Sequence, residues 1–212
     1  PQREEAMEIN SKNKISKNEE SCILYGVPKV EYCFKECTPF PACLKAVLNY
    51  MGQVIDYGYI MGTSGIAFRL RWRTSYWDGG NVDICYIYED PFEVFKRAFQ
   101  AAGRSYRILQ RRPDTVKEDF ISFLKPEIDA GRPVIALGLI GPPEACIITG
   151  YKQKGEILLG WNYFQEKPEF AKDVTFDESG YFQTGSWCEN KDTIALMSIG
   201  EECISRTSYK EL

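Results

Sequence analysis

Apolar residues are densest between residues 133 and 164, and their spacing predicts the centre of a β-sheet. Residues 133–140 (PVIALGLI) are almost continuously apolar, which is typical of a strand that is covered on both faces. Two further apolar runs occupy residues 145–151 and 156–164, and the polar segment 152–155 (KQKG) between them predicts a turn. These two runs therefore predict a β-hairpin with buried strands.

Three other segments show helical spacing. Apolar residues recur at i, i+3, i+4 and i+7 over residues 42–51, which predicts a short buried helix. A second helix is predicted over residues 90–103, with Asp90 as its N-cap. A third is predicted over residues 115–129, where the internal Pro126 predicts a kink or a break in two.

Residues 66–73 (IAFRLRWR) alternate strictly between apolar and basic side chains, which predicts a two-sided strand. Together with Ser64 in the Gly-rich bend before this strand, Arg69 and Arg71 are candidate ligand-binding residues, because a row of guanidinium groups can clamp a carboxylate or phosphate. The alternative is a solvated face beside acidic surface residues. Residues 82–88 predict another strand.

The chain of 212 residues is 44% hydrophobic and 14% aromatic, which is enough to fill one sizeable core. Residues 1–20 are polar and predict a flexible tail. We therefore expect a single α+β domain over residues 21–212, with a last strand at 192–200. The aromatic-rich segment 164–187 is a candidate surface for a protein partner or a second copy of the chain.

The charge balance limits the classes of partner. A net charge of -4 argues against nucleic acid, because a phosphate-binding surface needs an excess of Lys and Arg. No apolar run approaches the roughly 18 residues that a membrane-spanning helix needs. We expect no membrane partner and, by default, a cytoplasmic location.

Eight cysteines are spread along the chain, and their burial in apolar runs predicts reduced thiols. The group Cys33, Cys37 and Cys43 lacks the paired spacing and the histidine partners of a structural zinc site. We therefore expect no metal and no cofactor.

The candidate chemistry centres on a thiol and a carboxylate, because the chain has no histidine. Cys43 is placed at the start of the predicted helix, where the positive end of the helix dipole would lower its pKa. The alternative is that Cys43 packs beside Val47 in the core. On the first strand of the hairpin, period-two alternation puts Glu144 and Cys146 on the same side of the sheet, with Glu144 at the mouth.

The order of these segments resembles the papain-like fold of the C39-peptidase-like kind. It is most similar to the group around the N-terminal domain of the butirosin biosynthesis protein BtrH. The resemblance rests on four segments within residues 33–164: a Cys-bearing helix ending in NYMG, the bend MGTSGIAF, the run RPVIALGLIGPPEACIITGY and the run LLGWNYF. It implies a helix packed on a mainly antiparallel sheet, with a nucleophilic Cys at the helix start.

Carried onto this chain, the resemblance implies that the nucleophile position is Cys43, or Cys37 if the helix begins earlier. The position of the catalytic His falls on Glu144, and that of its Asn or Asp partner falls on Asn162, after Trp161. An ordinary carboxylate is a poor acceptor for a thiol proton and would raise the pKa of a neighbouring Cys, although burial can bring its own pKa toward neutrality.

Two functions from different classes follow. The first is a protein that binds a small molecule or peptide without catalysis, in a cleft that retains Glu144, Asn162 and Trp161 as polar anchors. The second is a cysteine-dependent acyltransferase or amide hydrolase, with Cys43 as nucleophile and Glu144 in the place of His.

Overall fold

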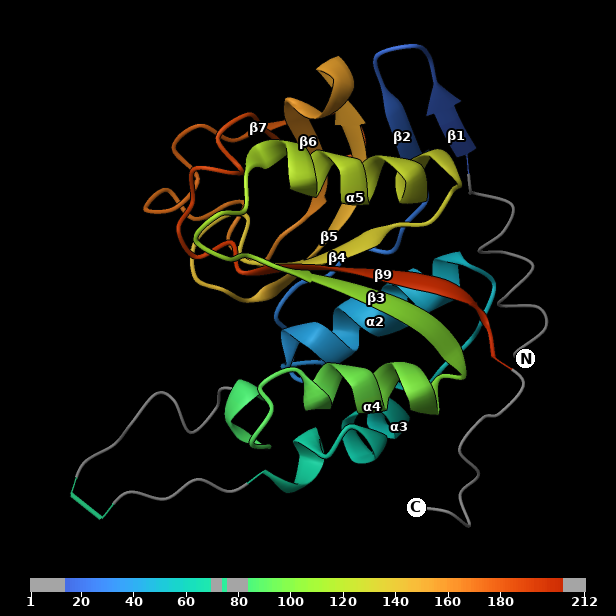
Figure 1. Ribbon diagram of the computed structural model, residues 1–212, viewed down its shortest axis with the longest axis vertical. Helices are drawn as coiled ribbons and strands as arrows, with labels where there is room; N and C mark the ends of the chain where they lie inside the picture. Colours follow the sequence, from blue (N-terminus) through green and yellow to red (C-terminus); the bar gives the residue numbers. More distant parts are fainter. Residues whose placement is uncertain (1–13, 70–73, 76–83, 204–212) are drawn as a thin grey trace. The chain divides into compact units, whose positions relative to one another are not determined.

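A computed structural model describes residues 14–69, 74–75 and 84–203 (Figure 1). The chain divides into two compact units where we expected a single domain. The larger unit takes in residues 14–54 and 107–199, and the smaller takes in the described part of residues 55–106 together with 200–203. The described residues include no helix long and apolar enough to cross a bilayer.

The larger unit is built on an antiparallel sheet. Every strand pair whose register is given runs antiparallel, and the main path of the sheet has the order β3-β9-β4-β5-β6-β8-β7. A second branch leaves this path, because β2 pairs with both β1 and β5. The nine strands among the described residues are β1 (Lys14–Lys17), β2 (Cys22–Tyr25), β3 (Arg104–Gln110), β4 (Val134–Leu137), β5 (Ala145–Lys152), β6 (Ile157–Trp161), β7 (Thr175–Phe176), β8 (Phe182–Thr184) and β9 (Ala195–Glu202).

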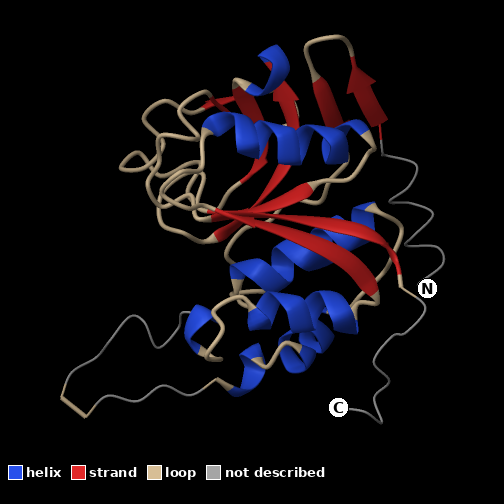
Figure 2. Ribbon diagram, viewed as in Figure 1, coloured by secondary structure: helices blue, strands red, loops and turns tan. Residues whose placement is uncertain are grey.

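Two helices cover the centre of this sheet. Figures 1 and 2 show α2 (Pro39–Tyr50) and α5 (Lys117–Asp129) on opposite sides of β4 and β5, and both helices pack on these two strands. As a result β4 is buried along its whole length and β5 is buried up to Tyr151. The predicted α+β class, the mainly antiparallel sheet and the buried hairpin of residues 145–164 are confirmed.

Two glycines allow the strands beside β5 to approach it closely. The register between β5 and β6 shifts at Ile148 and Gly150, so one extra residue bulges from β5. A Cβ atom on Gly160 would stand 1.8 Å from the carbonyl oxygen of Ile147, and one on Gly150 would stand 2.8 Å from that of Cys22. Any side chain at either position would therefore push β6 or β2 away from β5.

The beginning of the chain differs in part from the expected tail. Residues 14–17 form β1, which pairs with β2 through four residue pairs. Lys17 Nζ lies 3.4 Å from the carboxylate of Asp129, the last residue of α5. Residues 1–13 of the expected tail lie outside the described residues.

The smaller unit contains two helices, α3 (Tyr57–Thr63) and α4 (Glu93–Ala101), which pack together. The hydroxyl of Tyr59 on α3 donates to the carbonyl of Ala101 on α4 at 3.1 Å. α4 begins three residues after the predicted N-cap, and the side chain of Asp90 instead accepts a hydrogen bond from the amide of Phe92.

Two predicted strands of this unit are wrong over the residues that the structure describes. Residues 66–68 of the predicted strand 66–73 form the 3-10 turn η1 (Ile66–Phe68), and residues 84–86 of the predicted strand 82–88 form η3 (Ile84–Tyr86). Gly65 has φ 84°, and the hydroxyl of Tyr88 packs on it and donates to the carbonyl of Ser64. Because this turn directs the chain from α3 straight into η1, the period-two pattern is not used by a strand there.

Of the kink or break predicted at Pro126, the break is wrong, since α5 is one helix from Lys117 to Asp129. Pro126 lies in the last turn of α5, where a missing amide hydrogen bond affects only the end of the helix. Burial of Phe120, Leu124 and Ile128 holds the helix against the sheet on both sides of the proline.

Candidate functional site

Helix α2 carries Cys43, but not at its first turn. Thr38 is the N-cap, and the helix begins at Pro39. Proline is well tolerated in a first turn, because its missing N–H would have no acceptor within the helix there. The expectation that Cys43 opens the helix is therefore wrong, and this thiol is too deep in the helix for the dipole to activate it.

Burial decides the chemistry of Cys43. Its side chain is fully buried, and this loss of solvation raises the pKa of the thiol well above its usual value. The nearby thiol of Cys146 and the carboxylate of Glu144 raise the pKa of Cys43 further. The predicted lowering of this pKa is thus replaced by a shift in the opposite direction.

Cys146 is a second buried thiol at the site. It lies on β5 and is fully buried, which raises its pKa to about 12 although the side chain of Asn162, within hydrogen-bonding range, acts in the other direction. The thiol donates to the carbonyl of Ala136 on β4, with Sγ 3.6 Å from the oxygen. Cys146 has the same sequence signal as Glu144, since the period-two alternation places both on one side of the strand.

Asn162 follows the end of β6 and is held in place by the turn after it. Its backbone N–H donates to Oε1 of Gln165 at 2.9 Å, and its Oδ1 accepts from the N–H of Phe164 at 2.8 Å. The residue is buried. The amide group that faces Cys146 is therefore fixed by the fold before any ligand arrives.

Glu144 directly precedes β5 and is half-buried. It interacts with the hydroxyl of Tyr32: burial, and then the charge of Glu144 and a hydrogen bond to it, raise the pKa of Tyr32 to about 12. The ring of Tyr32 also packs on Tyr163, with centroids 4.6 Å apart. No local pattern in the sequence pointed to Tyr32, because its contact with Glu144 joins segments more than a hundred residues apart.

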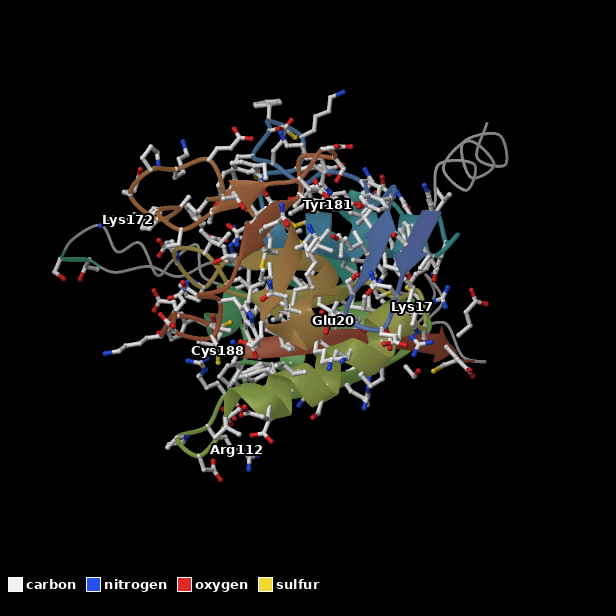
Figure 3. All side chains as sticks on the ribbon, turned by 90° about the horizontal axis from the view of Figure 1, so that it is seen from above. Lys17, Glu20, Arg112, Lys172, Tyr181 and Cys188 are labelled. Carbon is white, nitrogen blue, oxygen red and sulfur yellow. The ribbon has the colours of Figure 1, made fainter. Side chains whose placement is uncertain are left out.

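Tyr32 belongs to the loop between β2 and α2, which we call the arch (residues 26–38). At its first end, Tyr181 donates its hydroxyl to the carbonyl of Leu24 at 2.9 Å and accepts from the N–H of Val27 at 3.2 Å (Tyr181 is labelled in Figure 3). At its other end the arch runs into the N-cap of α2. Cys33 and Cys37 lie between these ends and are exposed.

The structure thus brings together Cys43, Glu144 and Asn162, which were predicted as a group, and adds Cys146 and Tyr32 to them. Cys43 lies on helix α2, Glu144 directly precedes β5, and Asn162 directly follows β6. The chemistry of the group differs from that of a thiolate site, because both thiols are buried in their neutral form.

The residues expected to bind a ligand have other contacts. Ser64 is buried and donates to the carbonyl of Ile60 at the end of α3, and Arg69 Nη1 donates to the carbonyl of Ile66 at 3.1 Å. Trp161 is buried and donates from Nε1 to the carbonyl of Val27 at 2.9 Å. Arg71 lies outside the described residues. Ser64, Arg69 and Trp161 therefore have roles within the fold.

A cavity of about 490 Å³ opens beside the loop between β4 and β5, whose last residue is Glu144. We call it the 139–143 cavity. Its walls come from that loop, from the segment before β7, from the end of β8 and from the segment before β9. The lining residues are Leu139, Ile140, Gly141, Pro142, Pro143, Glu169, Phe170, Lys172, Asp173, Val174, Thr184, Ser186, Glu189, Asn190 and Asp192.

Metal ligands are not gathered at this site. Among the described residues, no group of three or more cysteine and acidic side chains is placed to hold a metal ion.

Comparisons with family models, with curated proteins and with solved structures found no significant match to the chain.

Proposed function

We propose that the protein is a non-catalytic protein of papain-like architecture that binds a small molecule or peptide beside Glu144. The observation that carries this proposal is the state of Cys43, which is fully buried with a pKa well above its usual value. A nucleophilic cysteine needs an accessible thiolate, and Cys43 meets neither condition.

Burial is the main reason why the thiol of Cys43 stays neutral, and a carboxylate in the place of the imidazole adds to this effect. A protonated imidazole beside a cysteine stabilises the thiolate and lowers the cysteine pKa, whereas a carboxylate repels the thiolate and raises it. Glu144 acts in this second direction on Cys43. The same position that would activate the sulfur in a peptidase therefore suppresses it here.

The remaining features suit binding. Glu144 offers a half-buried charge, the hydroxyl of Tyr32 lies beside it, and Glu144 directly follows Pro143, which lines the 139–143 cavity. A volume of about 490 Å³ falls within the roughly 300–1,000 Å³ that small-molecule sites occupy.

Mass spectrometry with an acyl-thioester probe tests the non-catalytic part of the proposal. After exposure of the native protein near neutral pH, we expect acylation at the exposed Cys33, Cys37 and Cys203, and none at Cys43. A Cys33→Ser/Cys37→Ser/Cys203→Ser variant removes the exposed acceptors and should give no adduct on Cys43. An adduct on Cys43 that disappears in Glu144→Gln would instead establish the acyltransferase alternative and overturn the proposal.

A further inference from the structure

We propose that the 139–143 cavity binds a small organic dication, in which two ammonium groups are joined by a short hydrocarbon chain. This inference rests on the proposed function, since it names the class of ligand that the protein would bind. It is carried by the cavity, by the arrangement of its charges and by its apolar walls.

The cavity walls are fixed before a ligand enters. The side-chain amide of Asn190 donates to the carbonyl oxygens of Gly138 and Gly141, at 3.4 and 3.1 Å. The hydroxyl of buried Thr193 donates to the same carbonyl of Gly138. The loop between β4 and β5 is thus tied to the segment that precedes β9, and a site of this kind loses little entropy when it binds.

Gly141 gives one wall its shape. It has φ 74°, a conformation that L side chains rarely adopt, and an added Cβ atom would stand 3.1 Å from the rings of Phe164 and Phe170. These two rings meet edge to face, with centroids 5.3 Å apart. Because the backbone of Gly141 leaves room for them, the ring of Phe170 can form part of the cavity wall.

The charges of the lining are strongly unequal. Four carboxylates, Glu169, Asp173, Glu189 and Asp192, face a single ammonium group on Lys172. Figure 3 shows the segment with Lys172 on the same side of the larger unit as Cys188, the residue before Glu189. Within the part of the chain that the structure describes, none of the four carboxylates has a salt bridge shorter than 4.0 Å. The cavity therefore favours a cation.

The carboxylates come from separate wall segments, which favours an organic cation over a metal ion. A divalent metal needs several oxygen ligands within about 2.6 Å, and no such group of acidic side chains exists among the described residues. The acids instead come from separate wall segments, at 169–173 and 189–192. Two charges held apart on one ligand match this arrangement better than one charge at a point.

Apolar residues of the lining can contact the hydrocarbon chain of such a ligand. Pro142 and Val174 offer hydrocarbon surface in the lining, and Phe170 offers a ring. An ammonium group within about 6 Å of an aromatic face is attracted to it, by roughly 0.5–1 kcal/mol at an exposed site. A diamine would therefore contact both the acids and the apolar wall.

Titration calorimetry with 1,5-diaminopentane on the full chain tests the inference. We expect saturable binding to one site, no binding of the neutral 1,5-pentanediol, and no displacement by equimolar magnesium chloride. Asp173→Asn and Glu189→Gln should each weaken diamine binding about threefold, and the double variant about tenfold, as expected for exposed charge pairs. Glu178→Gln is the matched control, because Glu178 is exposed and lies outside the cavity lining.

Three results would overturn the inference: equal binding of the diol, unchanged affinity in the double variant, or an equal loss in Glu178→Gln. Each of these leaves the acyl-thioester result on Cys43 untouched, so the proposed function can stand when the ligand class is wrong. Conversely, an acyl adduct on Cys43 removes the non-catalytic proposal whether or not the diamine binds.

Discussion

The buried thiols of Cys43 and Cys146 differ in reactivity from the exposed thiols of the arch, although Cys43 follows the arch closely in sequence. Cys43 and Cys146 are fully buried and their pKa values are raised, whereas Cys33 and Cys37 are exposed to solvent. Position in the fold, and not residue type, therefore decides which sulfur can react. A cysteine in the right order of elements is not by itself evidence for catalysis.

We expect the largest effect from Gly160→Ala, which would disturb the strands that keep Cys146 buried. The added Cβ would meet the Ile147 carbonyl at 1.8 Å, between two central strands, and we expect a loss of about 4 kcal/mol or failure to fold. Chemical denaturation measures the loss, and thiol labelling should show Cys146 becoming accessible. Gly185→Ala is the control, because its nearest neighbouring atom is 3.8 Å away and its effect should stay within about 0.5 kcal/mol.

Alkaline pH should have the next largest effect, because it lowers the free energy of unfolding through the buried thiol of Cys146. The folded protein holds the proton of Cys146 up to about pH 12, whereas an unfolded chain releases it near the ordinary value of 9.0. The stabilisation is therefore complete below pH 9 and is lost as pH rises from 9 to about 12, by up to about 1.4 kcal/mol per pH unit for one group.

Urea denaturation at a series of pH values checks this dependence. Cys146→Ala should flatten the decline above pH 9, because it removes one of the groups that release a proton on unfolding. Cys33→Ser should leave the decline unchanged, since Cys33 is exposed. An equal flattening in both variants would contradict the assignment of the effect to burial.

Glu144→Gln should have a smaller effect, on pKa values and not on the fold. Removing the carboxylate lowers the pKa of Tyr32 below about 12 but leaves it above its ordinary value of 10.0, because burial is the larger cause of the shift. Nuclear magnetic resonance of ring-labelled tyrosine, assigned with Tyr32→Phe, follows this titration. Glu166→Gln, at an exposed position, should leave the Tyr32 titration unchanged.

The smallest effect is expected for Tyr32→Phe. Tyr32 is 49% exposed, so losing its hydroxyl should lower the free energy of unfolding by about 1 kcal/mol or less. Thermal denaturation measures this loss, with Phe34→Ala as the control at a fully exposed side chain. A loss of several kcal/mol would show that the arch contributes far more to stability than its exposure indicates.

The sequence predicted the strands of the site better than its helix. Continuous apolar residues and β-branched side chains marked β4, β5 and β6, because buried strands leave that pattern whatever surrounds them. The start of α2 was misplaced because Pro39 and Pro41 were assigned to the segment before the helix, although both lie in its first turn. Because the helix begins three residues earlier than predicted, Cys43 lies in the core and not at the helix end.

Other parts of the site have no local signal at all. The contact of Tyr32 with Glu144 and the donation from Trp161 to Val27 join the arch to distant strands, and only the folded chain reveals them. In the smaller unit, the alternation of residues 66–73 matched a strand, but Gly65 and Tyr88 direct the chain into a 3-10 turn. The periodicity of apolar residues alone therefore does not determine whether the backbone forms a strand or a 3-10 turn.

The anchoring of the arch at both ends has a consequence for signals arriving from outside. A bulky group attached to Cys33 or Cys37 would lie on a loop that is anchored at both ends, because Tyr181 forms hydrogen bonds at its start and helix α2 begins at its end. Tyr32, the residue before Cys33, makes the contact between the arch and Glu144. Modification of the exposed thiols would therefore take place one to five residues from a contact with the carboxylate, in a loop that is anchored at both ends.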